Sequence, residues 1–176
     1  LIVGAGTFTG SDVNGGAGSG AAGNDTEAGS DLFLMAGTTT TFSPATGTTL
    51  AFAGSIADDS AASLPGGTYT GGTGPGAAVI IAGAGTVIYS ASQSYTYSGD
   101  TTVSSSLLQV NGTITNSDVI VTGTGTLGGT GTILGDVSVQ SGGTLDPGLT
   151  TGELATGNLS FVSGATRQAP KPFYAG

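Results

Sequence analysis

The chain has 176 residues, of which 35 are glycine, eleven are acidic and two are basic, and its formal net charge is −9. It has no histidine and no cysteine, which excludes Ser-His-Asp and Cys-His catalysis, zinc sites built from these residues, and haem held by an axial His or Cys. Two basic residues cannot form a phosphate-binding surface, so nucleic acid is excluded as a partner.

Short β-strands are predicted along most of the chain, and helix signals are nearly absent. Glycine, threonine, serine and valine dominate, and strong helix formers other than alanine are scarce. Runs of β-branched and aromatic residues bounded by glycine, proline or serine predict strands. In chain order these runs are residues 39–42, 48–52, 78–81, 86–89, 107–110, 119–122, 137–140 and 159–162.

The composition divides the chain into three regions. Residues 1–76 are β-rich but less regular, and the glycine-, alanine- and serine-rich stretches 10–29 and 58–76 are expected to form loops. Residues 77–166 carry a repeat, and residues 167–176 are expected to be a tail or linker because they contain two prolines and both basic residues.

The spacing of the strands predicts a β-solenoid, which is an all-β coil of stacked parallel strands. Val-Ile-Val at 119–121 precedes Gly-Thr-Leu at 125–127, and the pair recurs with the same internal spacing as Val-Ser-Val at 137–139 and Gly-Thr-Leu at 143–145. Leu-Ser-Phe at 159–161 follows after a slightly longer interval. A unit of roughly 20 residues is typical of solenoids. Inward Val, Ile and Leu, with Ile120 and Val139 among them, are expected to form the core, and glycine the corners.

From residue 85 onward the sequence resembles the passenger-associated transport repeat (autotransporter-associated β-strand repeat) of bacterial autotransporter passenger domains. The matching pieces are GTVIY at 85–89, YTYSGDTTV at 95–103, LQVNG at 108–112, GTLGGTGTI at 125–133, GDVSV at 135–139, SGGTLDPG at 141–148 and GNLSF at 157–161. Gln93 stands where the family usually has Asn, and Ser104-Ser-Ser106 replaces a glycine-containing turn. The resemblance implies a right-handed parallel β-helix, exported to the Gram-negative cell surface, from a parent chain that carries a membrane β-barrel.

Three glycine-rich motifs suggest ligands, but each has a structural explanation: strands joined by glycine-rich corners for the first two, and a solvated turn at Asp136 for the third. The stretch 123–128 has the Gly-x-Gly-x-x-Gly spacing of dinucleotide loops, and the stretch 1–10 has the similar Gly-x-Gly-x-x-x-Gly, but no helix pattern follows either of them. The stretch 128–136 is similar to a calcium-binding nonapeptide, but Ile133 stands where that repeat needs Asp. Calcium binding by the acidic loops is left open, and the sequence predicts no cofactor, no metal ligand and no catalytic residue.

Acidic and aromatic clusters each allow two interpretations. Asp58 and Asp59 are adjacent, so in a strand they would point to opposite faces and could not act together. Asp100, Asp118 and Asp136 share a repeat phase, unlike Asp146, and would form either a carboxylate ladder or a column of turn caps. The tyrosines offer either a sugar-binding platform or core stacking; they are Tyr89, Tyr95 and Tyr97.

Together these observations favour a non-enzymatic, surface-displayed or secreted stalk that supports export and adhesion, with a host or cell-surface ligand that the sequence does not identify. The alternative is a self-assembling extracellular filament or matrix subunit, because the open ends of solenoids can associate. A polysaccharide-acting enzyme is a third hypothesis, and it would need a carboxylate column beside an aromatic groove.

Overall fold

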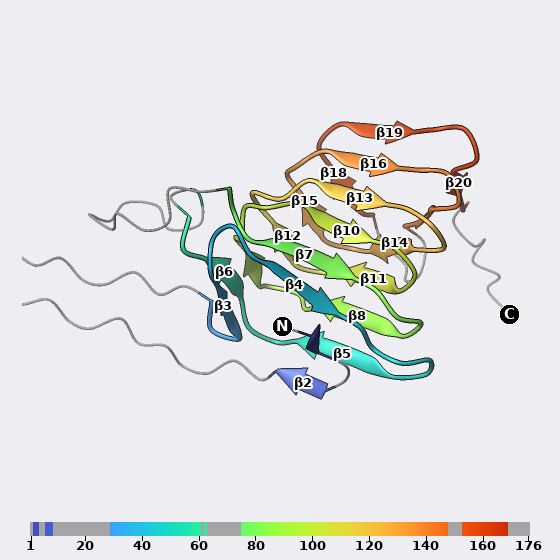
Figure 1. Ribbon diagram of the computed structural model, residues 1–176. Coiled ribbons are helices and arrows are strands. Elements are labelled where there is room, and N and C mark those ends of the chain that lie inside the picture. The colour runs from blue at the N-terminus through green and yellow to red at the C-terminus, as the bar shows by residue number, and fades with distance from the viewer. Residues whose placement is uncertain are drawn as a thin grey trace, which may run out of the picture.

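The computed structural model describes residues 2–3, 6–8, 29–60, 62, 75–147 and 153–168, with only the backbone described for 2–3 and 6–8. Every regular element in these ranges is a β-strand (Figure 1). No helix in the described ranges is long and apolar enough to cross a membrane.

The strands form a β-solenoid in which successive turns stack through parallel pairing. Sheet A contains β1 (Ile2–Val3), β4 (Thr39–Phe42), β7 (Ala78–Ile81), β10 (Thr101–Val103), β13 (Val119–Val121), β16 (Val137–Val139) and β19 (Leu159–Phe161). Sheet B contains β2 (Gly6–Phe8), β5 (Thr49–Phe52), β8 (Thr86–Tyr89), β11 (Leu107–Val110), β14 (Thr126–Gly129), β17 (Thr144–Asp146) and β20 (Thr166–Arg167).

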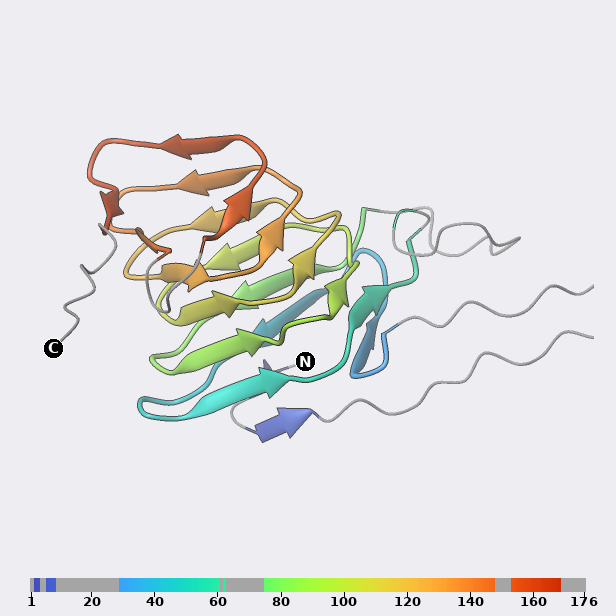
Figure 2. The ribbon, with the colours of Figure 1, turned by 180° about the vertical axis from the view of Figure 1, so that it is seen from behind.

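Shorter strands form the third side of the coil. Sheet C pairs β3 (Leu32–Leu34) with β6 (Ile56–Asp58), and sheet D contains β9 (Ser94–Tyr95), β12 (Thr113–Ile114), β15 (Thr132–Ile133) and β18 (Ala155–Thr156). The Thr96 N–H donates to the Ile56 carbonyl at 2.8 Å, so sheet D continues above sheet C. Figure 2 shows the same stack from behind.

The register confirms the solenoid predicted from the spacing. Thr101 pairs with Val119, and Val119 pairs with Val137, so these two turns are equal in length. Val137 then pairs with Leu159, one slightly longer turn away. The repeat seen in the sequence is therefore the distance from one strand of sheet A to the next.

Inward side chains fill the coil in columns, and in one column of sheet A and one of sheet B the side chains become smaller over the central turns. One column of sheet A runs through Phe42, Ile81, Val103, Val121 and Val139, all 0% exposed. The matching column of sheet B runs through Phe52, Tyr89, Val110 and Gly129. In these two columns the buried aromatic rings lie in the lower turns, where Phe42 and Phe52 have ring centroids 4.8 Å apart. Aliphatic side chains follow above them, and the half-exposed Phe161 of β19 ends the column of sheet A.

The prediction that Ile120 points into the core is wrong, whereas the same prediction for Val139 is confirmed. Ile120 pairs with Ser138 and is partly exposed, while its neighbours Val119 and Val121 are buried. Successive strand residues point to opposite faces. Val139 pairs with the buried Val121, so its side chain points into the core, whereas that of Ile120 points outward.

Small residues occupy the corner that leads into sheet B. A Cβ on Gly125 would lie 2.3 Å from the Val103 carbonyl oxygen of the turn below, so this position cannot hold a larger side chain without a shift of the backbone. Ser106 takes the same place one turn lower and donates its hydroxyl to the Ala82 carbonyl. Serine can therefore take the place of glycine here, because its hydroxyl donates a hydrogen bond to the backbone of the turn below.

Candidate functional site

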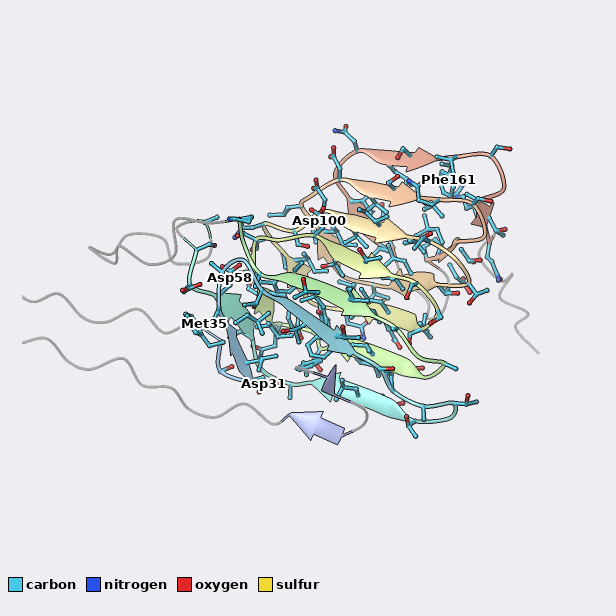
Figure 3. The ribbon with its side chains drawn as sticks, in the orientation of Figure 1. Asp31, Met35, Asp58, Asp100 and Phe161 are labelled. Carbon is cyan, nitrogen blue, oxygen red and sulfur yellow. The ribbon has the colours of Figure 1, made fainter. Side chains whose placement is uncertain are left out.

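Buried polar groups gather where sheet C meets the next turn of the coil. Asp58 ends β6, and its side chain is 0% exposed. Its Oδ2 accepts N–H bonds from Ala77 and Ser98, each at 2.8 Å, and its Oδ1 accepts the Ser60 N–H at 3.1 Å and the Ser60 hydroxyl at 2.5 Å. The Ser98 hydroxyl also donates to Oδ2, at 3.2 Å. We call Asp58, Ser60, Ala77 and Ser98 the Asp58 clamp; Figure 3 labels Asp58.

Hydrogen bonding keeps the Asp58 carboxylate charged although it is buried. Burial by itself would raise its pKa, but the Ser60 hydroxyl and the backbone N–H groups of Ser98, Ala77 and Ser60 together lower the pKa below its ordinary value. The clamp therefore joins three parts of the chain: β6, the segment entering β7, and the turn after β9. Its geometry indicates a structural role, because it saturates the oxygens that a ligand would need.

Asp58 and Asp59 do not form a cooperating pair, in agreement with the sequence analysis. Asp59 is also buried, but its Oδ1 accepts the Ala36 N–H, so it serves a different segment from Asp58. Each carboxylate organises its own stretch of backbone, and no acid–base pair results.

The three clustered tyrosines lie in the core, so the platform interpretation is wrong for them. Tyr89 and Tyr95 stack with centroids 4.1 Å apart and planes 16° apart, and all three tyrosines are 0% exposed. The Tyr89 and Tyr97 hydroxyls lie 3.1 Å apart, and the Tyr97 hydroxyl lies 2.6 Å from that of Thr101. Thr101 in turn lies 2.8 Å from the Ser117 hydroxyl. Core packing and internal hydrogen bonds thus use the groups that would have contacted a sugar.

The acidic column exists, and two of its three carboxylates make the hydrogen bonds of turn caps. Asp100, Asp118 and Asp136 each precede a strand of sheet A, and all three are exposed. Asp118 Oδ1 accepts the Asp136 N–H at 2.8 Å, and Asp136 Oδ1 accepts the Asn158 N–H at 3.1 Å. Asp146 lies apart from the column, within β17. Asp118 and Asp136 therefore each bind the backbone of the turn above.

Gly123 and Gly125 lie in the corner between β13 and β14, as expected, whereas Gly128 and Gly129 lie inside β14. Gly123 follows β13 in the left-handed region, at φ 59°, and β14 begins three residues later. The stretch 128–136 runs through β14 and β15 to the turn that holds Asp136. The motif at 1–10 falls on β1 and β2, and its remaining residues lie outside the described ranges, as do most residues of the predicted loop at 10–29.

The described residues contain no group of three acidic side chains placed to hold a metal ion. Sequence reasoning missed the Asp58 clamp, whose only local signal is an Asp with a Ser two residues later at the end of a strand. The partners Ala77 and Ser98 lie 19 and 40 residues away in sequence, so only the fold brings them together.

Comparison with known proteins adds no function to this geometry. No protein-family model, no curated protein and no solved structure matches the chain. The assignment of a role depends on the fold and on the contacts described above.

Proposed function

We propose that the chain is a non-enzymatic, rigid segment of a surface-displayed passenger of the autotransporter type, which supports its own export and holds adhesive parts of the protein away from the cell. The observation that supports this most is the continuous in-register stack, whose interior is filled by its own side chains from Phe42 to Leu145. A coil of this kind resists bending because each turn is hydrogen-bonded to the next.

Two further features favour an export role. The chain has no cysteine, so no disulfide can form before it crosses an outer membrane. Each turn contacts chiefly its neighbours, so folding can propagate from one turn to the next once the chain emerges. The tyrosines and the Asp58 clamp are used internally, which favours a structural role over an enzymatic one.

The export role can be tested by fusing the chain, with an N-terminal epitope tag, to an outer-membrane translocator in a Gram-negative bacterium. Intact cells are labelled with antibody and treated with a nonspecific protease. We expect surface labelling and a protease-resistant coil. Val121→Asp places a charge in the core and should abolish the resistance, whereas Ile120→Asp, one residue away on the outer face, should keep it.

A wild-type chain that stays inside the cell, or that is digested as readily as Val121→Asp, would contradict the export role. Adhesion is measured on the same cells. Cells that display the wild-type chain should attach to host cells or to one another more than cells that display the translocator alone. Equal attachment would contradict the adhesive role and leave the export result to be judged separately.

A further inference from the structure

At the upper end of the coil, formed by β18, β19 and β20, the hydrogen-bond series of sheet A stops. From β7 to β16, the first inward residue of each strand of sheet A donates its N–H to the carbonyl oxygen of the residue before the next strand, at 2.8 to 3.0 Å. The donor–acceptor pairs are Val79–Asp100, Thr101–Asp118, Val119–Asp136 and Val137–Asn158. The next donor in the series is the Leu159 N–H, and no described strand lies above β19 to accept it.

The carbonyl groups of sheet A show the same interruption. Val121 O accepts the Gln140 N–H at 2.7 Å, and Val139 O accepts the Val162 N–H at 3.0 Å. The next carbonyl in this series belongs to Phe161, and the described part of the chain places no donor above it. An edge strand with unpaired N–H and C=O groups is a template for adding another strand.

Apolar side chains accompany these unpaired groups. Leu159 and Phe161 are 43% and 41% exposed, whereas Val137 and Val139, below them in the same columns, are 1% and 0% exposed. Figure 3 places Phe161 on the outermost strand of the stack. On the other two sides the inward positions hold Thr156 and Arg167, so the apolar surface is concentrated on sheet A.

The opposite end of the same chain offers strands of matching polarity. β1 and β2 belong to sheets A and B, and in the described part of the chain each pairs on one side only, with β4 and β5. All strands within each sheet are parallel. Only a head-to-tail arrangement of two copies keeps the strands parallel and places sheet A on sheet A and sheet B on sheet B.

We propose that the N-terminal end of a second copy, formed by β1 and β2, docks on the upper end of the first copy, formed by β19 and β20. Sheets A and B then continue from one copy into the next. Leu159 and Phe161 become buried, and the Leu159 N–H and Phe161 carbonyl gain partners. Because each copy carries a net charge of −9, salt should strengthen the association by screening the repulsion between copies.

The first test is sedimentation of the purified chain over a range of protein and salt concentrations. We expect the average mass to rise with both. A chain that remains monomeric at its highest soluble concentration in high salt would overturn the proposal. Phe161→Lys places a charge on the docking edge and should abolish the association. Ser160→Lys is the matched control, because Ser160 is the next residue on the same strand and has its side chain on the outer face.

A second pair of variants tests the head-to-tail direction. Thr41 and Ala51 direct their N–H groups towards β1 and β2. Two residues that are register partners in a parallel pair direct their N–H groups the same way. Their partners Ile2 and Thr7 therefore direct their N–H groups away from the coil, towards the free side. The double variant Ile2→Pro/Thr7→Pro removes both donors and should block the N-terminal end. Far-UV circular dichroism of each variant must match that of the wild type before its association is compared.

Mixing the two blocked variants gives the decisive result. Phe161→Lys keeps a free N-terminal end, and Ile2→Pro/Thr7→Pro keeps a free C-terminal end, so together they should form a one-to-one complex and nothing larger. Self-association of Ile2→Pro/Thr7→Pro alone would indicate that two C-terminal ends pair with each other, and would overturn the proposal. A mixture that stays monomeric while the wild type associates would also overturn it.

Discussion

Replacing Asp58 tests whether the Asp58 clamp stabilises the coil. Asp58→Ala leaves the N–H groups of Ala77, Ser98 and Ser60 without their acceptor in a buried site. A hydrogen bond to a charged group contributes about 1.5–3 kcal/mol, and the three are not additive because they share one carboxylate. We therefore expect the free energy of unfolding to fall by about 3–5 kcal/mol.

Asp58→Asn should lower the free energy of unfolding by less than Asp58→Ala, because the amide keeps part of the hydrogen bonding. The amide has one acceptor oxygen, which serves the Ala77 and Ser98 N–H groups best when it occupies the place of Oδ2. Its NH₂ group then faces the Ser60 N–H, so one donor is left unpaired and the charge is lost. The expected cost is about 1.5–3 kcal/mol.

The assay is thermal and urea unfolding followed by far-UV circular dichroism, with hydrogen exchange at the Ala77 and Ser98 amides. For a chain of this size 1 kcal/mol lowers Tm by about 2–4 °C, so Asp58→Ala should lower it by roughly 6–20 °C. Exchange at both amides should accelerate in either variant. Asp100→Asn is the matched control, because Asp100 is exposed and should change the free energy of unfolding by at most about 0.5 kcal/mol.

The pH dependence provides an independent check. Because the pKa of Asp58 is lowered in the folded chain, its contribution to stability is present above the ordinary carboxyl pKa of about 4 and is lost as the pH falls below that value. The stability difference between wild type and Asp58→Asn should therefore shrink in acid. An Asp58→Asn variant as stable as wild type at neutral pH, with the same acid profile, would refute the reasoning.

Three further predictions follow from the packing. Val121→Asp should lower the free energy of unfolding by several kcal/mol, and Ile120→Asp by about 1 kcal/mol or less, as measured by urea unfolding; equal losses would contradict the assigned phase. Gly125→Ala should be more destabilising than Gly47→Ala, because a Cβ at Gly47 meets nothing within 4 Å, so that only its backbone conformation (φ 73°) is strained; the reverse order of Tm values would contradict the corner geometry. Burial raises the pKa of three of the five tyrosines, so in an alkaline absorbance titration these three should ionise only as the coil unfolds, and ionisation of all five near pH 10 with the fold intact would contradict their burial. These tyrosines are Tyr89, Tyr95 and Tyr97.

Much of the coil could be predicted because its longer strands repeat in register. The strands predicted at 39–42, 78–81, 86–89 and 107–110 have the bounds that the structure gives them. These segments alternate buried and partly buried or exposed residues, and alternation is the signal that a strand leaves in a sequence. The regular spacing of the repeat then indicates which strand lies above which in the stack.

The parts that could not be predicted lack that signal. Two-residue strands such as β9 and β12 are too short to show alternation, and they exist because neighbouring turns pair with them. Val119, Ile120 and Val121 are all apolar, so their sequence does not say which of them faces inward. The Asp58 clamp depends on partners far away in the sequence, and local reasoning could show only that Asp58 and Asp59 do not cooperate.

The decrease in side-chain size from Phe42 to Val139 in sheet A and from Phe52 to Gly129 in sheet B affects how the turns of the coil align with one another. In an array of identical rungs, a turn that slips onto the wrong neighbour loses little, because every rung offers the same surface. Here Phe52 lies in line with Tyr89, Val110 and Gly129, so a turn displaced by one step would put a ring where there is room only for a valine. The unequal side-chain sizes therefore make misaligned stacks costly and favour a single alignment of the turns.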